Sequence, residues 1–213
     1  MKLSGLYAIT PDCANSEILV AKVRAALHFA HLGGWAALQY RNKTAGPAQR
    51  AAEAKALRAL CRARAVPLIV NDDVELALAV GADGVHLGRD DDALTAARAR
   101  LNNGLLGASC YDRLDLARAA LAAGADYVAF GSVYPSTTKP GAVRASLDLL
   151  AAAHALGAPV VAIGGITLER APEVLRAGAD CLAVISDLFD APDIAQRARA
   201  YASLFAAKAS LSA

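Results

Sequence analysis

Eight short apolar runs that alternate with eight Ala-rich helical patterns predict a single (β/α)8 barrel, of the TIM-barrel class, over residues 1–213. The length of 213 residues lies at the short end of the range for this class. The chain is 56% hydrophobic but only 5% aromatic, so its core is aliphatic, which is typical of a parallel sheet covered by helices. Because no Pro- or Ser-rich linker divides the chain, we predict one domain.

Each predicted strand is a short apolar run bounded by Gly, Pro, Asn or Asp. The strand predictions are residues 3–9, 36–40, 67–70, 84–87, 105–108, 127–130, 160–163 and 181–185. The helical patterns are residues 17–32, 47–64, 74–80, 93–100, 114–123, 146–156, 168–177 and 192–205. A strand followed by a helix, eight times in succession, indicates parallel strands joined by right-handed crossovers.

The predicted helices end in a recurring glycine motif. Gly-Ala-Asp occurs at residues 81–83, 124–126 and 178–180, and glycine also follows the helical patterns at residues 33–34 and 157. Glycine at this place lets a helix end through a left-handed residue and lead into the next strand. The motif therefore indicates the helix-to-strand turns of successive βα units.

An open, doubly wound sheet is the alternative to a closed barrel. A dinucleotide-binding sheet of that kind carries GxGxxG after its first strand, whereas this chain has TPDCANS at residues 10–16. The missing fingerprint and the eight βα units favour the barrel.

Composition excludes several classes of protein. The 22 Lys and Arg residues nearly balance the 20 Asp and Glu residues, and no basic run suggests a nucleic-acid partner. The four cysteines are widely separated, without a CxxC pair, which indicates isolated reduced thiols. We find no N-terminal signal, and charges interrupt every apolar stretch before ~18 residues, so we expect a cytoplasmic protein without a membrane span. A homo-oligomer is compatible with the sequence.

Polar residues follow seven of the predicted strands. In barrels of this class the chemistry is carried by the loops after the strands. The polar segments are residues 39–43, 71–73, 88–92, 109–110, 131–140, 164–166 and 185–186. They predict a ring of functional groups at the carboxyl ends of the strands, which makes the barrel a catalytic domain.

Acidic residues follow two neighbouring strands. Asp72 or Asp73 can cap the helix at 74–80, and the acids at 90–92 can cap the next helix. There are more carboxylates than capping needs, and neighbouring strands lie ~5 Å apart. Two carboxylates at this spacing suit Mg²⁺, which retains waters and bridges to phosphate.

Two anion sites are predicted on the same rim. Gly164 and Gly165 after one strand and Ser186 after the next lie where barrels of this class bind phosphate, although the glycines can also be only a tight turn. The side chains of Arg41, Lys43 and Lys139 converge on the rim and predict a second anion, a diphosphate.

The four histidines are interpreted as structural residues. His28 and His31 lie on the first predicted helix and His154 lies on a late helix. His86 lies inside a strand, where the alternation of side chains can point it into the barrel, and we assign it to the core.

The sequence resembles the thiamine phosphate synthase family along nearly its whole length. The resemblance is carried, in the family's order and spacing, by LYAITPD (6–12), QYRNK (39–43), VNDDVELALAVGADGVHLGRDD (70–91), GADYVAFGSVYPSTTKP (124–140), VVAIGGI (160–166) and LAVIS (182–186). It implies a Mg²⁺-dependent transferase. Such an enzyme joins hydroxymethylpyrimidine diphosphate to hydroxyethylthiazole phosphate and releases pyrophosphate.

The resemblance also implies roles for individual residues. By resemblance, the pyrimidine diphosphate would contact Gln39, Arg41, Lys43, Asn71, Ser109 and Lys139. Tyr40 and Asn42, within the same QYRNK segment, are also expected to bind substrate. Mg²⁺ is bound by Asp72 and Asp91. The thiazole phosphate contacts Ser136, Thr137, Thr138, Gly165, Ile185 and Ser186. Arg41, Lys43 and Lys139 are the expected catalytic residues, acting on the leaving diphosphate, because no Ser/His/Asp or Cys/His relay indicates a covalent route.

Some positions depart from the family pattern. Asn42 and Arg89 stand where acidic residues and Gln are common, Ser136 replaces the first Thr of TTTK, and Cys110-Tyr111 replaces Thr/Val-His. None of these changes removes a charge that the reaction needs. A related thiazole tautomerase is the alternative enzyme, but it does not need the Arg, Lys and Asp set retained here. A non-catalytic ligand-binding barrel is a third hypothesis, which turnover with both substrates would separate from either enzyme.

Overall fold

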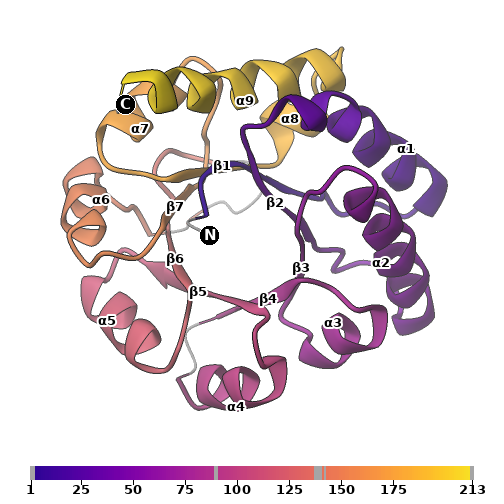
Figure 1. The fold of residues 1–213 in the computed structure, drawn as a ribbon, viewed down its shortest axis with the longest axis horizontal. Coiled ribbons are helices and arrows are strands. Elements are labelled where there is room, and N and C mark those ends of the chain that lie inside the picture. Colours follow the sequence, from indigo (N-terminus) through magenta and orange to yellow (C-terminus); the bar gives the residue numbers. More distant parts are fainter. Residues whose placement is uncertain (1–2, 89–90, 137–140, 142, 212–213) are drawn as a thin grey trace.

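The eight strands form a closed parallel barrel in chain order, which confirms the predicted fold class. The computed structural model describes residues 3–88, 91–136, 141 and 143–211, with only the backbone of Asp91, Asp92 and residues 206–211. Figure 1 shows the barrel at the centre and the helices as a ring around it.

Every strand prediction falls on an observed strand. The strands are β1 (Gly5–Ile9), β2 (Trp35–Tyr40), β3 (Leu68–Asn71), β4 (Gly84–Leu87), β5 (Leu105–Tyr111), β6 (Tyr127–Phe130), β7 (Val160–Ile163) and β8 (Cys181–Val184). The main correction concerns β5, which continues past its predicted end at residue 108. Tyr111 pairs with Phe130 of β6 after a shift in register, so Ser109 and Cys110 lie within the strand and not in the loop after it.

The helices agree less closely with the predictions at their ends. The helices are α1 (Ser16–Ala26), η1 (Leu27–Leu32), α2 (Pro47–Arg62), α3 (Val74–Val80), α4 (Asp91–Leu101), α5 (Leu114–Ala122), α6 (Leu147–His154), α7 (Ala171–Arg176), α8 (Ser186–Phe189) and α9 (Ile194–Leu211). The predicted helix at 17–32 is split, because its second half tightens into the 3-10 helix η1, a common way for helices to end. The short helix α8 was not predicted, since four residues are too few to show a helical period.

The Gly-Ala-Asp motifs close the amino-terminal end of the barrel. Their glycines, Gly81, Gly124 and Gly178, all have positive φ angles, as predicted for helix exits. The aspartates that follow accept hydrogen bonds from backbone amides at or near the start of the preceding strand. The pairs are Asp83 with the Leu68 amide (2.7 Å), Asp126 with the Leu106 amide (2.7 Å) and Asp180 with the Val160 amide (3.0 Å). The motif thus satisfies strand amides that have no partner within the sheet.

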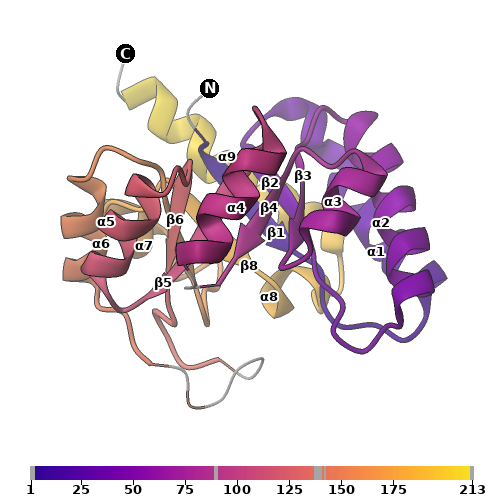
Figure 2. The same cartoon turned by 90° about the horizontal axis from the view of Figure 1, so that it is seen from below.

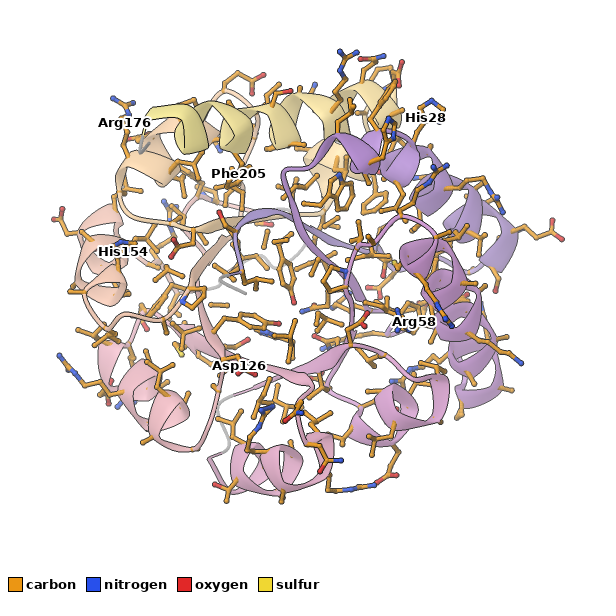
Figure 3. All side chains as sticks on the ribbon, viewed as in Figure 1. His28, Arg58, Asp126, His154, Arg176 and Phe205 are labelled. Carbon is orange, nitrogen blue, oxygen red and sulfur yellow. The ribbon has the colours of Figure 1, made fainter. Side chains whose placement is uncertain are left out.

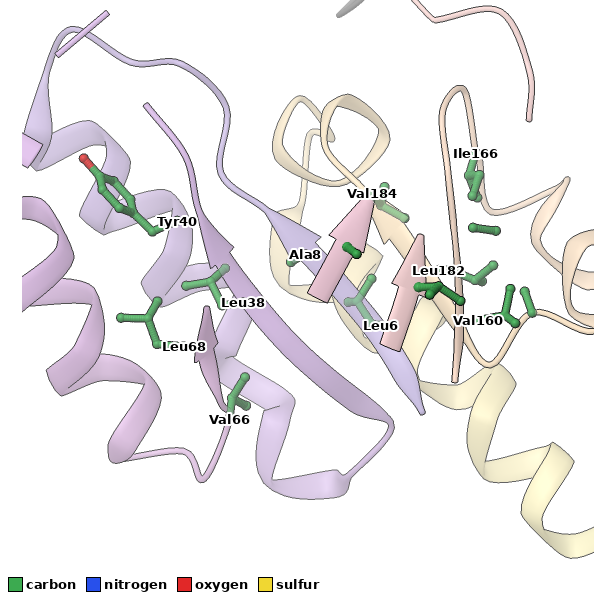
Figure 4. Packing of buried hydrophobic residues seen from close by; sticks show 14 of the residues in the cluster. Leu6, Ala8, Leu38, Tyr40, Val66, Leu68, Val160, Ile166, Leu182 and Val184 are labelled. Atoms are coloured by element: carbon green, nitrogen blue, oxygen red, sulfur yellow. The ribbon is translucent and has the colours of Figure 1, made fainter. Parts of the chain in front are cut away.

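Two apolar layers lie on opposite sides of the barrel wall. The larger layer fills the space between the strands and the surrounding helices, and it includes Leu6, Leu38 and Leu68 (Figure 4). A smaller layer fills the barrel interior and includes Tyr7, Ile69 and Tyr127. Side chains that alternate along each strand are therefore divided between a helix-facing and an interior set.

The two ends of the barrel differ in what they carry. Figure 2 shows both chain termini at one end and α8 toward the other, where the strands lead into their following helices. His28 and His154 lie on the outer ring (Figure 3), far from the barrel axis. None of the helices in the described part of the chain is long and apolar enough to cross a membrane.

Candidate active site

A cleft of about 300 Å³ opens at the carboxyl ends of β2 and β3. Its lining residues are Tyr40, Arg41, Asn42, Lys43, Ala45, Arg50, Asn71 and Asp72. The cleft thus brings together the predicted cations of the β2 loop and the predicted acid of the β3 loop. Arg50 was missed by the sequence analysis, because a single arginine on α2 looks like ordinary surface charge.

The loop after β1 holds the loop after β2 in place. The Thr10 hydroxyl donates to the Arg41 carbonyl at 2.7 Å and accepts from the Arg41 amide at 2.8 Å. Asp12 accepts from Arg41 Nη1 at 2.9 Å and from the Lys43 amide at 2.7 Å. Burial alone would raise the pKa of Asp12, but these two hydrogen bonds and the nearby positive charges hold it below its usual value. Asp12 therefore stays ionised and fixes the position of Arg41.

Tyr40 and Asn42 border the cleft, but their polar groups turn toward the buried carboxylate of Glu53. The Tyr40 hydroxyl and Asn42 Nδ2 donate to Glu53 Oε2 at 2.7 and 3.0 Å. Ser16 Oγ and Gln49 Nε2 donate to Glu53 Oε1 at 2.7 and 2.9 Å. We therefore assign the side chains of Tyr40 and Asn42 to holding the β2–α2 loop, whereas contact of these two residues with substrate stays a prediction.

Glu53 is charged in this setting. Desolvation would raise the pKa of its carboxyl, but hydrogen bonds from the four donors outweigh that effect and keep the pKa below its ordinary value. The sequence does not reveal this role, because Glu53 lies on α2 and a glutamate in a helix is usually solvated. The cluster anchors the loop that carries Arg41 and Lys43.

Replacing Glu53 by Ala is expected to lower the free energy of unfolding by about 3 kcal/mol, because buried donors lose their acceptor. Urea unfolding of both proteins measures the change. Glu75→Ala is the matched control, since Glu75 is exposed and pairs with Arg100 at the surface. A loss in the control as large as that in Glu53→Ala would contradict the anchoring role.

Asp72 and Asp73 have different roles. Asp73 is the N-cap of α3, where its Oδ1 accepts from the Leu76 amide at 2.9 Å and its Oδ2 pairs with Arg50 Nη2 at 3.0 Å. Asp72 is exposed, adopts a φ of 62° and accepts a hydrogen bond from Asn71 Nδ2 at 2.7 Å. The capping alternative therefore holds for Asp73, whereas the Asp72 carboxylate remains available in the cleft.

The predicted metal pair is only partly described. β3 and β4 are paired neighbours, and Asp72 and Asp91 follow these two strands in the sequence. Asp91 begins α4, but its side chain lies outside the described part of the chain. Within the described residues no group of three or more His, Cys, Asp or Glu side chains could hold a metal ion. Mg²⁺ commonly uses one or two carboxylates together with water and phosphate, so the donor type at Asp72 suits it.

Five polar side chains form a hydrogen-bonded chain through the barrel interior, which we call the interior chain. Gln39 Nε2 donates to the Tyr7 hydroxyl at 3.0 Å, and the hydroxyls of Tyr7 and Tyr127 lie 2.7 Å apart. His86 Nδ1 lies 3.2 Å from the Tyr127 hydroxyl, and its Nε2 lies 2.9 Å from Ser109 Oγ. The interior chain connects Gln39 and Ser109, two predicted substrate-binding residues that lie on strands β2 and β5.

His86 is buried, as the sequence analysis assigned it. Desolvation lowers the pKa of its imidazole to about 4. Sequence alone could not find its partners, because they come from other strands, Ser109 from the neighbouring strand β5 and Tyr127 from β6.

The free energy of unfolding is expected to depend on pH through His86. Its folded pKa of about 4 lies below the ordinary value of 6.5, so the unfolded chain binds the extra proton first as the pH falls. The stability that depends on a neutral His86 is fully present above pH ~6.5 and is lost as the pH falls toward ~4. The loss in the free energy of unfolding amounts to about 3 kcal/mol. Urea unfolding across this window, compared between wild type and His86→Gln, isolates the effect. Parallel pH curves for the two proteins would contradict it.

The loops after β6 and β7 pack closely against each other. Gly164 and Gly165 have φ angles of 103° and 59°, and a Cβ atom would collide with Ser132 Oγ at the first and with the Pro135 carbonyl at the second. The Tyr134 amide also donates to the Gly164 carbonyl at 3.0 Å. The tight-turn interpretation is therefore correct for these glycines, and their contact with phosphate stays a prediction.

The remaining predicted residues are placed as follows. Ser136 is half-buried in the loop after β6. Ile185 follows β8 and packs against the interior layer, and Ser186 begins α8. Thr137, Thr138 and Lys139 lie outside the described residues, so the structure does not test their roles.

A closed (β/α)8 barrel whose polar side chains gather at the carboxyl ends of its strands has the architecture of a barrel enzyme. Comparison with known proteins narrows this class. A family model described as thiamine monophosphate synthase matches residues 6–188. The chain belongs to this family, and it is a transferase of the thiamine-phosphate synthase type.

Individual relatives match this chain along nearly its full length. The chain is 58% identical over 207 residues to thiamine-phosphate synthase of Azoarcus sp. (strain BH72), covering 96% of this chain and 98% of the relative. It is 56% identical over 208 residues to the Chromobacterium violaceum enzyme of the same name, covering 97% and 99%. The solved structure of thiamine phosphate pyrophosphorylase from Pyrococcus furiosus matches with a TM-score of 0.80 at 35% identity, covering 95% and 96%.

Proposed function

We propose that the chain joins hydroxymethylpyrimidine diphosphate to hydroxyethylthiazole phosphate, forming thiamine phosphate and pyrophosphate. The observation that carries the proposal is the cleft, which is lined by Arg41 and Lys43 from the loop after β2 and by Asn71 and Asp72 at the end of β3. This set combines cations, an amide and a carboxylate, which suits a diphosphate bound with a divalent cation. An isomerase of the thiazole alone has no use for such a set.

Arg41 and Lys43 would bind and neutralise the diphosphate. Arg41 is oriented by Asp12, which accepts from its Nη1 atom, and a guanidinium has five N–H donors, so further donors can reach the anion. The Lys43 amide is held by the same carboxylate. The Arg41 guanidinium is therefore positioned before substrate binds, and the backbone of Lys43 is held beside it, so the Arg41 charge does not need to reorganise as the leaving group forms.

Asp72, together with Asp91, would hold Mg²⁺. When bound, the ion adds positive charge beside the diphosphate oxygens. Asp72 itself has a positive φ angle, and the neighbouring residue, Asp73, serves as the N-cap of α3. The carboxylate of Asp72 is therefore not used for capping. Asn71 donates to that carboxylate and restrains its position.

The chemistry needs no protein base. The bond between the methylene carbon and the diphosphate oxygen breaks, and its electron pair leaves with the pyrophosphate. The resulting pyrimidine carbocation is stabilised by its ring amino group, and the lone pair of the thiazole nitrogen then forms the new C–N bond. Because that nitrogen carries no proton, none has to be removed. This agrees with a site built from charges and amides.

The thiazole phosphate would bind at the loops after β6, β7 and β8. Ser136, Gly165, Ile185 and Ser186 are the described residues of the set that the family resemblance implies. β6 pairs with β7 and β7 pairs with β8, so these loops are adjacent. The location agrees with the phosphate site of many barrel enzymes.

A coupled assay for pyrophosphate release tests the proposed function. We expect release when both substrates and Mg²⁺ are present, and none with either substrate alone. Isomerisation of a thiazole phosphate without pyrophosphate release would identify a tautomerase instead. Binding of both compounds without any turnover would identify a non-catalytic barrel.

A further inference from the structure

The interior chain ends at Ser109, which is half-exposed at the rim of the barrel. We propose that His86 is a positioning residue that turns the hydroxyl hydrogen of Ser109 toward the bound diphosphate. The identity of that anion rests on the proposed function. The direction of the hydrogen bonds rests on the interior chain itself.

The direction is set at the Gln39 end. Gln39 Nε2 donates to the Tyr7 hydroxyl, whose other hydrogen-bond partner among the described residues is the Tyr127 hydroxyl. If Tyr127 donated to Tyr7, the Tyr7 hydrogen would have no acceptor within this network. Tyr7 is 1% exposed, and an unsatisfied buried donor is costly. Tyr7 therefore donates to Tyr127.

The Tyr127 hydrogen is then directed to His86. The Tyr127 ring is fully buried and occupies space left by Gly107, where a Cβ atom would collide with the ring. Because its oxygen accepts from Tyr7, its hydrogen is donated to His86 Nδ1. A ring nitrogen that accepts carries no hydrogen, so the hydrogen of the neutral imidazole lies on Nε2.

The Ser109 hydroxyl oxygen accepts a hydrogen bond from that N–H group. His86 Nε2 donates to Ser109 Oγ at 2.9 Å, and no other described residue has a hydrogen bond to this hydroxyl group. The Ser109 hydrogen can therefore be donated to an anion at the rim. In the reverse direction Ser109 would donate to His86 and present only lone pairs to the anion, which would weaken binding.

Nitrogen-15 NMR of the histidine rings tests the direction of the chain. In wild type we expect His86 to carry its hydrogen on Nε2, with its signals identified by their loss in His86→Gln. Tyr7→Phe and Tyr127→Phe form a matched pair, because each removes one hydroxyl of the same contact. Tyr7→Phe should retain the Nε2–H form, whereas Tyr127→Phe should give a mixture. A hydrogen on Nδ1 in wild type, or no change in Tyr127→Phe, would overturn the proposal.

Binding of inorganic pyrophosphate with Mg²⁺ tests the consequence without requiring turnover. We expect Kd to rise about tenfold in Ser109→Ala and about fivefold in Tyr127→Phe, the size of one hydrogen bond. Tyr127→Phe should not raise Kd further when Ser109→Ala is already present. His86→Gln retains an N–H donor and should bind more tightly than His86→Leu.

Additive effects of Ser109→Ala and Tyr127→Phe, or equal binding by His86→Gln and His86→Leu, would overturn the positioning role. A wild-type chain that binds pyrophosphate in this pattern without synthase turnover would contradict only the proposed function. The two failures are thus distinguishable.

Discussion

Replacing Asp72 by Asn is expected to lower kcat/KM by about 10² or more, equivalent to roughly 2.7 kcal/mol of transition-state stabilisation. The carboxylate is exposed in the cleft and is not the cap of α3, so its loss removes the proposed metal ligand without removing the cap of that helix. Activity should also vanish with a chelator and return with Mg²⁺. Steady-state kinetics with both substrates measure each effect.

Asp73→Asn is the matched control for this prediction. Asp73 caps α3, and Asn is as good an N-cap as Asp, so the helix should be retained and the loss of activity should be much smaller. Wild-type turnover without metal would reject the Mg²⁺ site. Equal losses of activity in the two variants would show that charge near the cleft, not a specific ligand, is what matters.

An electron-withdrawing substituent on the pyrimidine ring is expected to slow the chemical step by about 10² or more, equivalent to roughly 2.7 kcal/mol. The substituent would destabilise the proposed carbocation, which would form as the diphosphate departs. Single-turnover measurements with saturating thiazole phosphate isolate this step from binding and product release. A substituent of similar size and neutral electronic effect is the control for fit.

Rates that rise or stay flat with such substituents would replace the dissociative route by direct displacement. The role assigned to Arg41 and Lys43 is separable from that outcome, because a diphosphate leaves in either route. The loss of rate caused by replacing Arg41 or Lys43 should depend on the charge of the leaving group. That loss should depend little on the pyrimidine substituent.

The barrel could be predicted because its signals are local. Short apolar strands, Ala-rich helices and glycine turns each occupy a few adjacent residues, and their order alone fixes a parallel topology. The place of Arg41, Lys43 and Asp72 followed from the same logic, since residues after parallel strands meet at one end of a barrel. α8 escaped prediction because a single turn shows no period.

Other parts of the site depend on contacts between distant residues. Nothing near Glu53 in the sequence shows that it meets Ser16 and Tyr40, and nothing near His86 shows that it meets Tyr127 and Ser109. The pairing of the strands and the packing of the helices on them bring these groups together. The choice between Asp72 and Asp73 as the cap also needed the backbone, because both residues suit that position by type.

The stoichiometry of a single turnover tests the central claim most directly. With enzyme in excess over pyrimidine diphosphate, and with thiazole phosphate and Mg²⁺ present, we expect one thiamine phosphate to form for each pyrophosphate released. Mass spectrometry of the quenched reaction measures both products. Pyrophosphate released without thiamine phosphate, or an unchanged pyrimidine diphosphate, would contradict the account.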